Sequence, residues 1–392
     1  MARSTRAAAA PSHRARNAGL LGAIVGLAAA GTAVGVGLTR SAARRVQAGE
    51  FGPAGSTRPA AELREEDPLG SAARQADRTA LVTTEDGVLL AVDEIGPRDA
   101  PLTVVFIHGY TLSMASWGFQ RRTLAADLAT ANGHRPSARL VFYDQRGHGT
   151  SGRGDADRCT MRQLGRDLGA VLDARVPRGP VVLIGHSMGG MTIMALAAVR
   201  PELFGDRVVG VSLMSTSSGN LSDLDFGLPE MLTRLRGALL PVAAWTMRRR
   251  PALAERTRWL GADVVSAVTR MLSFGGPVDP AIARYVDAMI AGTPVDVIAE
   301  FYPAIAGLDE TGSLDPLRRV PVLVLTGDHD KLIPKAHSEL LVEGLGGEAS
   351  EGVEYVVVPS AGHLVPLEKP DVVTAAISRL LRRVAADRPT LR

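Results

Sequence analysis

The feature that most constrains this chain is a Gly-x-Ser-x-Gly pentapeptide, Gly185–Gly189, set between two apolar runs. Val181–Ile184 before it read as a buried strand, and Met191–Ala198 after it read as a buried helix. A strand that turns this sharply into a helix strains the backbone of its central residue, and the flanking glycines remove side chains that would collide. The hydroxyl then stands at the end of the strand, so Ser187 is predicted to be a nucleophile rather than a structural turn residue.

A nucleophilic serine needs a base, and the base needs an orienting acid. The sequence offers both at the ends of later strand-like runs. Residues 320–326 lead to Asp328 and Asp330, and residues 353–358 lead to His363. Serine, then acid, then histidine is the chain order expected after such an elbow. Strands that end in these residues bring them to one edge of an open α/β sheet, where ligands bind. Either aspartate could serve as the acid.

Four motifs in this order resemble those of the α/β-hydrolase-fold serine hydrolases, in the branch of esterases and lipases with a helical cap. They are His108–Tyr110, Asp144–Gly149, the Ser187 elbow and the aspartate–His363 pair. The resemblance runs from about residue 79 to about residue 383. It implies an α/β fold with a mostly parallel sheet, helices on both faces and an inserted helical cap over the active site.

The resemblance also assigns the acid. The family has Gly-x-x-Asp after the acid-bearing strand and a proline a few residues later, which here selects Asp330 with Pro334 behind it. Asp328 is the alternative, and it is otherwise read as a turn carboxylate that accepts backbone N–H groups. The catalytic set implied in this way is Ser187, Asp330 and His363.

Acyl transfer also needs two backbone N–H donors for the oxyanion. Met188, the residue after the nucleophile, is one expected donor. The resemblance gives Tyr110 as the second, which leaves the tyrosine side chain free to line the pocket. Thr111 and Trp117 are further candidates for the substrate pocket, although a large aromatic at position 117 is as often core as ligand contact.

Other polar residues near these motifs are interpreted as structural. They either hold the active-site loops by hydrogen bonds or lack the spacing of zinc ligands, so neither a metal nor another cofactor is expected. These residues are His108, Asp144, Arg146, His148, His186, His329 and His337.

Composition agrees with one large α/β domain. Eight apolar strand-like runs alternate with helical stretches, which predicts a mostly parallel sheet covered on both faces. The pI of about 9.3 reflects an excess of arginine, and many of the arginines lie in the N-terminal region and the cap and not in one stripe, so no nucleic-acid partner is expected. Cys159 is the only cysteine, which excludes an internal disulfide, and it is interpreted as a buried or half-buried thiol.

The N-terminal region is read as separate. Residues 1–18 form a basic tail, 19–39 an uncharged apolar segment and 40–78 a flexible linker. The apolar segment is long enough for a membrane anchor, with a cleaved export signal or a soluble extension as alternatives. Arg40, Arg44 and Arg45 argue against efficient export, and the balanced positive charge does not fix an orientation.

The hydrolase core is expected over residues 79–216 and 318–388, with a helical cap over 217–317. The cap is predicted to hold helices over 228–240, 251–272 and 280–290. Apolar residues beside Arg248–Arg250 could touch a lipid surface or could pack the cap on the core with the arginines solvated.

The function predicted from these features is hydrolysis of a small-molecule carboxylic ester, lipid-derived or not, through a Ser-His-Asp triad and an acyl-enzyme. C–C bond hydrolysis, peptide hydrolysis and perhydrolysis by the same triad remain open, as does a ligand receptor without turnover. The sequence does not give the acyl-chain length or the oligomeric state.

Overall fold

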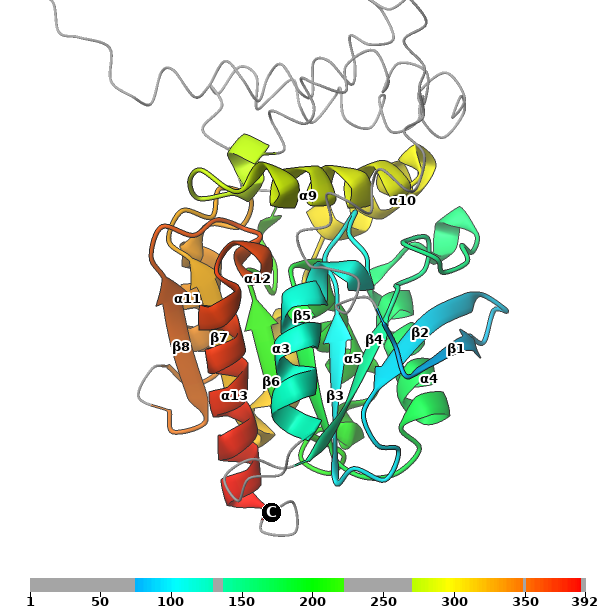
Figure 1. The fold of residues 1–392 in the computed structure, drawn as a ribbon, viewed down its shortest axis with the longest axis vertical. Coiled ribbons are helices and arrows are strands. Elements are labelled where there is room, and N and C mark those ends of the chain that lie inside the picture. The colour runs from blue at the N-terminus through cyan, green and yellow to red at the C-terminus, as the bar shows by residue number, and fades with distance from the viewer. Residues whose placement is uncertain (1–74, 130–136, 222–269, 348–349, 389–392) are drawn as a thin grey trace, which may run out of the picture. The chain divides into compact units, whose positions relative to one another are not determined.

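The computed structural model describes residues 75–129, 137–221, 270–347 and 350–388, which contain one eight-stranded sheet with helices on both faces (Figure 1). Each of the eight predicted runs is a strand, so the predicted fold class is confirmed. The strands are β1 (Arg78–Thr83), β2 (Leu89–Ile95), β3 (Leu102–Ile107), β4 (Ala138–Tyr143), β5 (Val181–His186), β6 (Val208–Met214), β7 (Val322–Gly327) and β8 (Val353–Val358).

The sheet has the order β1-β2-β4-β3-β5-β6-β7-β8. β2 pairs antiparallel with β1 and β4, and all other pairs are parallel. Every residue of β3, β4, β5, β6 and β7 is buried, whereas the edge strands β1 and β8 are partly exposed. Burial on both faces explains why the inner strands are continuous apolar runs in the sequence.

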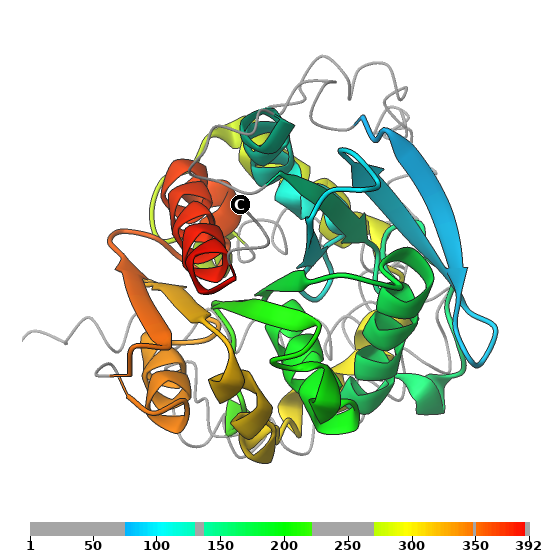
Figure 2. The same cartoon turned by 90° about the horizontal axis from the view of Figure 1, so that it is seen from below.

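Helices cover the sheet on both sides. Seen from below, α3 and α13 lie against one face, and α4, α5 and α11 lie against the other (Figure 2). The helices are α3 (Gly118–Ala129), α4 (Met161–Arg175), α5 (Met188–Val199), α9 (Pro280–Gly292), α10 (Val295–Ala306), α11 (Lys335–Gly344), α12 (Val365–Glu368) and α13 (Pro370–Asp387).

Local signals place the ends of these helices. The Thr160 hydroxyl accepts the N–H of Gln163 at 3.1 Å and so caps α4, and Pro370 occupies the first turn of α13, where a missing N–H costs nothing. The buried stripe of α13 joins the main core cluster over the sheet, whose members include Val373, Ile377, Leu380, Leu381 and Val384. This packing fixes the C-terminal helix against the strands that carry the site.

In the described part of the region expected to form the cap, α9 and α10 are helices. The helix predicted over 280–290 is α9, whereas α10 was not predicted. β-branched residues in its first turns and Pro303 within it weaken the helical signal of α10. The helices predicted over 228–240 and 251–272 lie wholly or almost wholly outside the described residues, as do Arg248–Arg250, and the domain boundaries remain predictions.

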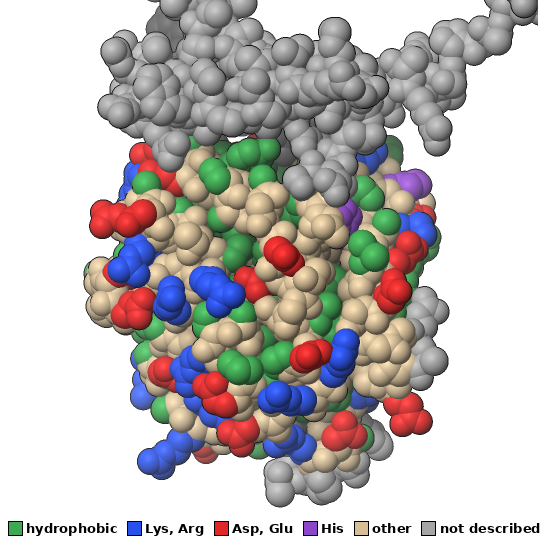
Figure 3. Space-filling view, turned by 180° about the vertical axis from the view of Figure 1, so that it is seen from behind, with side chains coloured by type: hydrophobic (Ala, Val, Ile, Leu, Met, Phe, Trp, Pro, Cys, Tyr) green, Lys and Arg blue, Asp and Glu red, His purple; other side chains and the backbone are tan. Residues whose placement is uncertain are grey.

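The described residues can be compared with two further expectations, the lack of a nucleic-acid partner and the membrane anchor. On the face drawn in Figure 3, basic and acidic side chains alternate, without a single basic stripe. Within the described ranges, no helix combines the length and the apolar character that crossing a membrane requires. The tail 1–18, the apolar segment 19–39 and nearly all of the linker 40–78 lie outside the described residues.

Candidate active site

Ser187 occupies the tight turn between β5 and α5, with φ 53° and ψ −120°. Left-handed backbone of this kind is strained for a serine, and it persists because the turn is packed on every side. A Cβ on Gly185 would lie 2.6 Å from the carbonyl of Gly189, and a Cβ on Gly189 would lie 2.2 Å from the carbonyl oxygen of Ile107. The Ser187 N–H donates to the carbonyl of Met214 at 2.8 Å. The predicted elbow is therefore present, and only glycine fits its flanks.

Ser187, His363 and Asp330 form a chain of two hydrogen bonds. His363 Nε2 lies 2.9 Å from Ser187 Oγ, and His363 Nδ1 lies 2.9 Å from Asp330 Oδ2. An ionised carboxylate only accepts, so Nδ1 carries the proton and the Nε2 lone pair faces the serine hydroxyl. All three residues are buried. This tautomer is the one that a general base for Ser187 requires.

The structure brings Asp330 to the histidine and leaves Asp328 away from it. The N–H groups of Leu332 and Ile333 donate to Asp330 Oδ1 at 2.9 and 2.8 Å, which holds the other oxygen toward His363. Asp328 is exposed, and its N–H continues the ladder to the carbonyl of Val358. The spacing that selected Asp330 in the sequence therefore agrees with the geometry.

His186 contacts the backbone of His363. Its Nε2 lies 2.8 Å from the carbonyl oxygen of His363, so this nitrogen carries a proton and donates. Burial and the neighbouring His363 lower the pKa of His186 to about 3. His186 is therefore a neutral donor, the buried neighbour that the sequence predicted.

The loop after β3 lies against the elbow. A Cβ on Gly109 would stand 2.9 Å from His186 Nδ1 and 3.1 Å from Ser187 Cβ, so this close approach also requires glycine. Among the described residues, the backbone N–H groups of Tyr110 and Met188 have no hydrogen-bond partner. Both predicted oxyanion donors are thus left available at the loop and at the start of α5.

The pocket residues expected from the sequence are placed differently. The Tyr110 hydroxyl donates to the carbonyl of Ile298 in α10, so this side chain ties the loop to the cap and is not free to line a pocket. Burial raises the pKa of Tyr110. The Thr111 hydroxyl donates to the Tyr110 carbonyl at 2.7 Å. Trp117 is fully buried in the core against Phe106, which corrects its placement at a pocket edge.

The residues interpreted as structural are engaged within the fold. The N–H of Gln145 donates to His108 Nε2 at 2.9 Å, so His108 Nδ1 carries the proton and donates to the Gly109 carbonyl at 2.8 Å. His337 Nδ1 lies 2.9 Å from Ser217 Oγ, and His329 Nδ1 lies 3.2 Å from the Gly275 carbonyl. No group of three or more potential metal ligands occurs within the residues that the structure describes.

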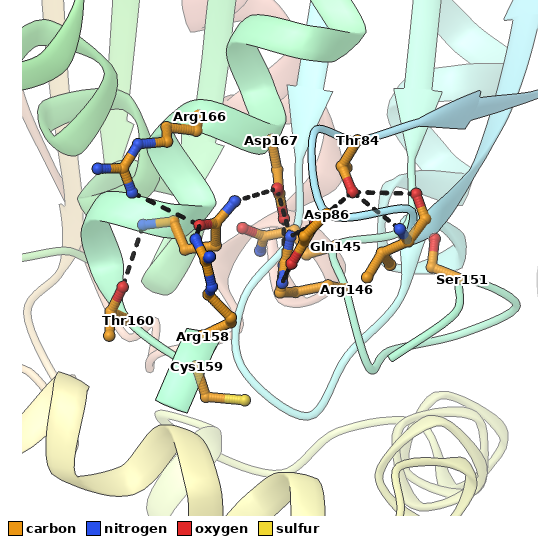
Figure 4. Close-up of polar contacts among 12 residues, drawn as sticks. Thr84, Asp86, Gln145, Arg146, Ser151, Arg158, Cys159, Thr160, Arg166 and Asp167 are labelled. Atoms are coloured by element: carbon orange, nitrogen blue, oxygen red, sulfur yellow. Dashed lines mark hydrogen bonds and ion pairs between the residues drawn. The ribbon is translucent and has the colours of Figure 1, made fainter. Parts of the chain in front are cut away.

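Arg146 joins three elements beneath this region (Figure 4). It makes bidentate ion pairs with Asp86, in the turn after β1, and with Asp167, in α4. The hydrogen bond from Arg146 lowers the pKa of Asp86, while burial raises the pKa of Asp167. Cys159 is buried nearby, as predicted, and burial raises the pKa of its thiol to about 12. Arg146 therefore has a structural role here.

Glu368 and Ile298 also contact residues of the site, and no sequence pattern pointed to either of them. Glu368 accepts the N–H of Gly362, directly before His363, at 2.8 Å. Ile298 contributes only a backbone carbonyl. Both contacts join segments far apart in the chain, which no local pattern encodes.

Known proteins are similar over most of this chain. The sequence is 28% identical over 279 residues to the bifunctional esterase/perhydrolase DCH of Acinetobacter calcoaceticus, covering 67% of this chain and 88% of that protein. It is 34% identical over 320 residues to a Bacillus subtilis protein provisionally named 2-succinyl-6-hydroxy-2,4-cyclohexadiene-1-carboxylate synthase, covering 78% and 99%. A solved thermophilic esterase from Thermogutta terrifontis superposes with a TM-score of 0.58 and 26% identity, covering 78% of this chain and 99% of its own.

The family follows from the extent of the match. The sequence model of the alpha/beta hydrolase family matches residues 104–376, which include the loop after β3, the elbow at Ser187, and both Asp330 and His363. The protein therefore belongs to the alpha/beta hydrolase family.

Proposed function

We propose that this hydrolase cleaves carboxylic esters with Ser187 as nucleophile, His363 as general base and Asp330 as the orienting acid. The observation that carries the proposal is the buried chain from Ser187 Oγ through His363 to Asp330, with both distances at 2.9 Å. A serine on a strained turn at the end of a strand, hydrogen-bonded to a histidine in the required tautomer, is the arrangement that activates a hydroxyl.

The reaction would proceed through an acyl-enzyme. Ser187 Oγ attacks the ester carbonyl carbon as His363 Nε2 takes its proton, and the same proton passes to the leaving alcohol when the C–O bond breaks. Water then attacks the acyl carbon as His363 Nε2 takes a proton from it. His363 passes this proton to Ser187 Oγ when the bond between the acyl carbon and Oγ breaks, which releases the acid and restores the serine hydroxyl. Asp330 stabilises the imidazolium at each transfer.

The N–H groups of Met188 and Tyr110 would hold the oxyanion of each tetrahedral intermediate. Gly109 supports this role, because its lack of a side chain lets the loop approach the elbow. Preorganised donors of this kind typically contribute a factor of about 10² to 10³ in rate. The Tyr110–Ile298 contact fixes the loop that carries one of them.

The proposal that the substrate is a carboxylic ester rests on the similarity of this chain to proteins named as esterases. The Acinetobacter protein is named an esterase/perhydrolase, and the Thermogutta structure is of an esterase. Attachment to a membrane through 19–39, or secretion after its removal, is a separate proposal that rests on the composition of that segment alone.

Labelling with a fluorophosphonate probe tests the nucleophile. We expect the full chain to be labelled and to hydrolyse p-nitrophenyl esters, and Ser187→Ala to lose both, with kcat lower by about 10⁶-fold. Rates across a series of acyl lengths would define the acyl pocket.

Ser215→Ala is a matched control. Ser215 is also a buried serine with positive φ (45°), but its hydroxyl has no partner among the described residues. This variant should be labelled like the parent. A folded parent chain that neither labels nor turns over any ester contradicts the proposal, and peracid formation without ester turnover would favour perhydrolysis.

A further inference from the structure

Residues Met271–Gly275, called the strap below, lie across the loop that carries Asp330. Lys331 Nζ donates to the Met271 carbonyl at 2.8 Å, and His329 Nδ1 lies 3.2 Å from the Gly275 carbonyl. The residues on both sides of Asp330 in the sequence thus contact opposite ends of the strap. The strap leads into α9, so it connects the region expected to form the cap with the loop that carries the acid.

The strap also contacts the loop that carries His363. The N–H of Leu364 donates to the Ser273 carbonyl at 3.0 Å. A Cβ on Gly275 would lie 2.5 Å from the carbonyl carbon of Ala361, and a Cβ on Gly362 would lie 2.4 Å from the Gly275 nitrogen. The two backbones therefore touch at a pair of glycines, where no other residue fits without displacement.

One carboxylate joins these two backbones. Glu368, the last residue of α12, accepts the Gly275 N–H at 3.0 Å on Oε1 and at 3.2 Å on Oε2. Its Oε2 also accepts the Gly362 N–H at 2.8 Å. The side chain is half-buried, and no ion pair to Glu368 occurs within the described ranges. Its carboxylate is thus directed to backbone amides from two distant segments.

The backbone around His363 is consequently held by three hydrogen bonds to three different elements. Gly362 donates to Glu368, the His363 carbonyl accepts from His186, and Leu364 donates to the strap. Phe274 of the strap packs in a small core cluster with Leu364, which adds an apolar contact at the same point. Of these supports, only the carboxylate accepts N–H groups from both the strap and the loop.

We propose that Glu368 is a positioning residue for the general base: it locks the strap onto the loop of His363 and so couples the cap to the imidazole. The proposal rests on the proposed function, because it gives Glu368 a role only if His363 acts on Ser187. Displacing a catalytic group by about 1 Å can lower a rate by about 10²-fold, so a support of this kind has a measurable effect.

The substitution Glu368→Gln removes the negative charge of the side chain and keeps its size and shape. The amide keeps one accepting oxygen, which in the Oε2 position still reaches both N–H groups, but it replaces Oε1, 3.0 Å from the Gly275 nitrogen, by an NH₂ donor. The variant therefore loses the negative charge and places two donors against each other at the strap. Glu368→Asp keeps the charge and should recover part of the rate. Glu354→Gln is the control, because Glu354 accepts Arg379 Nε at 2.7 Å near the opposite end of β8 and loses a comparable contact.

The rate of fluorophosphonate labelling and the kinetics of p-nitrophenyl ester hydrolysis are measured on full-length variants, with melting curves. For Glu368→Gln we expect labelling and kcat to fall about 10- to 100-fold with KM within about threefold, while Glu354→Gln keeps the parent rates. In Glu368→Gln, the acid limb of the pH–rate profile should also shift. A loss of protein stability alone would not cause this shift. Parent-like rates in a folded Glu368→Gln protein overturn the proposal.

A readout that does not need turnover keeps the two proposals distinct. The proton that His363 Nδ1 donates to Asp330 gives a downfield NMR signal. Should the parent chain fail to label, the proposed function is wrong, and this signal still reports the imidazole position. A signal that shifts or disappears in Glu368→Gln but not in Glu354→Gln supports the positioning role, and an unchanged signal refutes it.

Discussion

At the scale of single residues, the two aspartates after β7 give a matched pair of variants. Asp330 holds the His363 tautomer, so Asp330→Asn should lower kcat by about 10⁴-fold, because an amide can also donate to Nδ1 and so favour the wrong tautomer. Asp328 is exposed and lies away from the imidazole, so Asp328→Asn should stay within about twofold of the parent. Steady-state kinetics with one p-nitrophenyl ester compares both. The reverse ranking would assign the acid to Asp328.

The same residues show how far sequence reasoning reaches at this scale. The sequence brought Ser187, Asp330 and His363 together as one candidate site because each follows a predicted strand at a short offset, which local spacing encodes. The side chain of Tyr110 was misplaced because its partner, the carbonyl of Ile298, comes from a helix almost two hundred residues later. Trp117 likewise depends on packing against β3, which spacing does not reveal.

At the scale of elements, Arg146 ties the turn after β4 to α4 and to the β1–β2 turn. Arg146→Met should cost about 3–5 kcal/mol of unfolding free energy, because it leaves the Asp167 carboxylate buried without its cation. Asp86→Asn should cost less, about 1–2 kcal/mol, because the amide keeps one oxygen that can accept from Arg146 and because Asp167 still pairs with the guanidinium. Urea unfolding measures both.

The double variant Arg146→Met with Asp167→Leu separates the effect of charge from the effect of packing. Replacing both members of a buried ion pair by apolar side chains is often neutral. The double variant should therefore recover most of the unfolding free energy that Arg146→Met alone loses. A double variant as unstable as Arg146→Met alone would show that shape, and not the unpaired carboxylate, dominates.

Sequence reasoning was strongest for elements buried on both faces. The inner strands are apolar without interruption, so their positions follow from composition over five to seven residues. It missed α10, because Pro303 and the β-branched residues at its start hide a helix that packing stabilises. His148 and Phe301, whose ring centroids lie 5.7 Å apart, supply part of that packing.

At the scale of the whole molecule, three buried histidines predict how stability depends on pH. Burial lowers the pKa of His108 to about 4 and, together with a neighbouring histidine, the pKa values of His148 and His186 to about 3, against 6.5 for each in an unfolded chain. Below pH 6.5 the unfolded chain therefore binds protons that the folded chain refuses. The contribution of these neutral histidines to the unfolding free energy is therefore complete above pH 6.5 and is lost as the pH falls toward 4.

Each such histidine contributes a slope of about 1.4 kcal/mol per pH unit, so the three together can remove about 4 kcal/mol per unit. Burial raises the pKa values of Asp144 and Asp167, whose effect on stability has the opposite sign but acts only near the carboxylate range. The effect of the histidines is therefore clearest between about pH 6 and about pH 5. His148→Asn places a donor near the Nδ1 position and cannot titrate. Urea unfolding should therefore show a dependence of stability on pH that is shallower by about 1.4 kcal/mol per pH unit than that of the parent. A slope equal to that of the parent would mean that His148 takes up its proton without unfolding the chain.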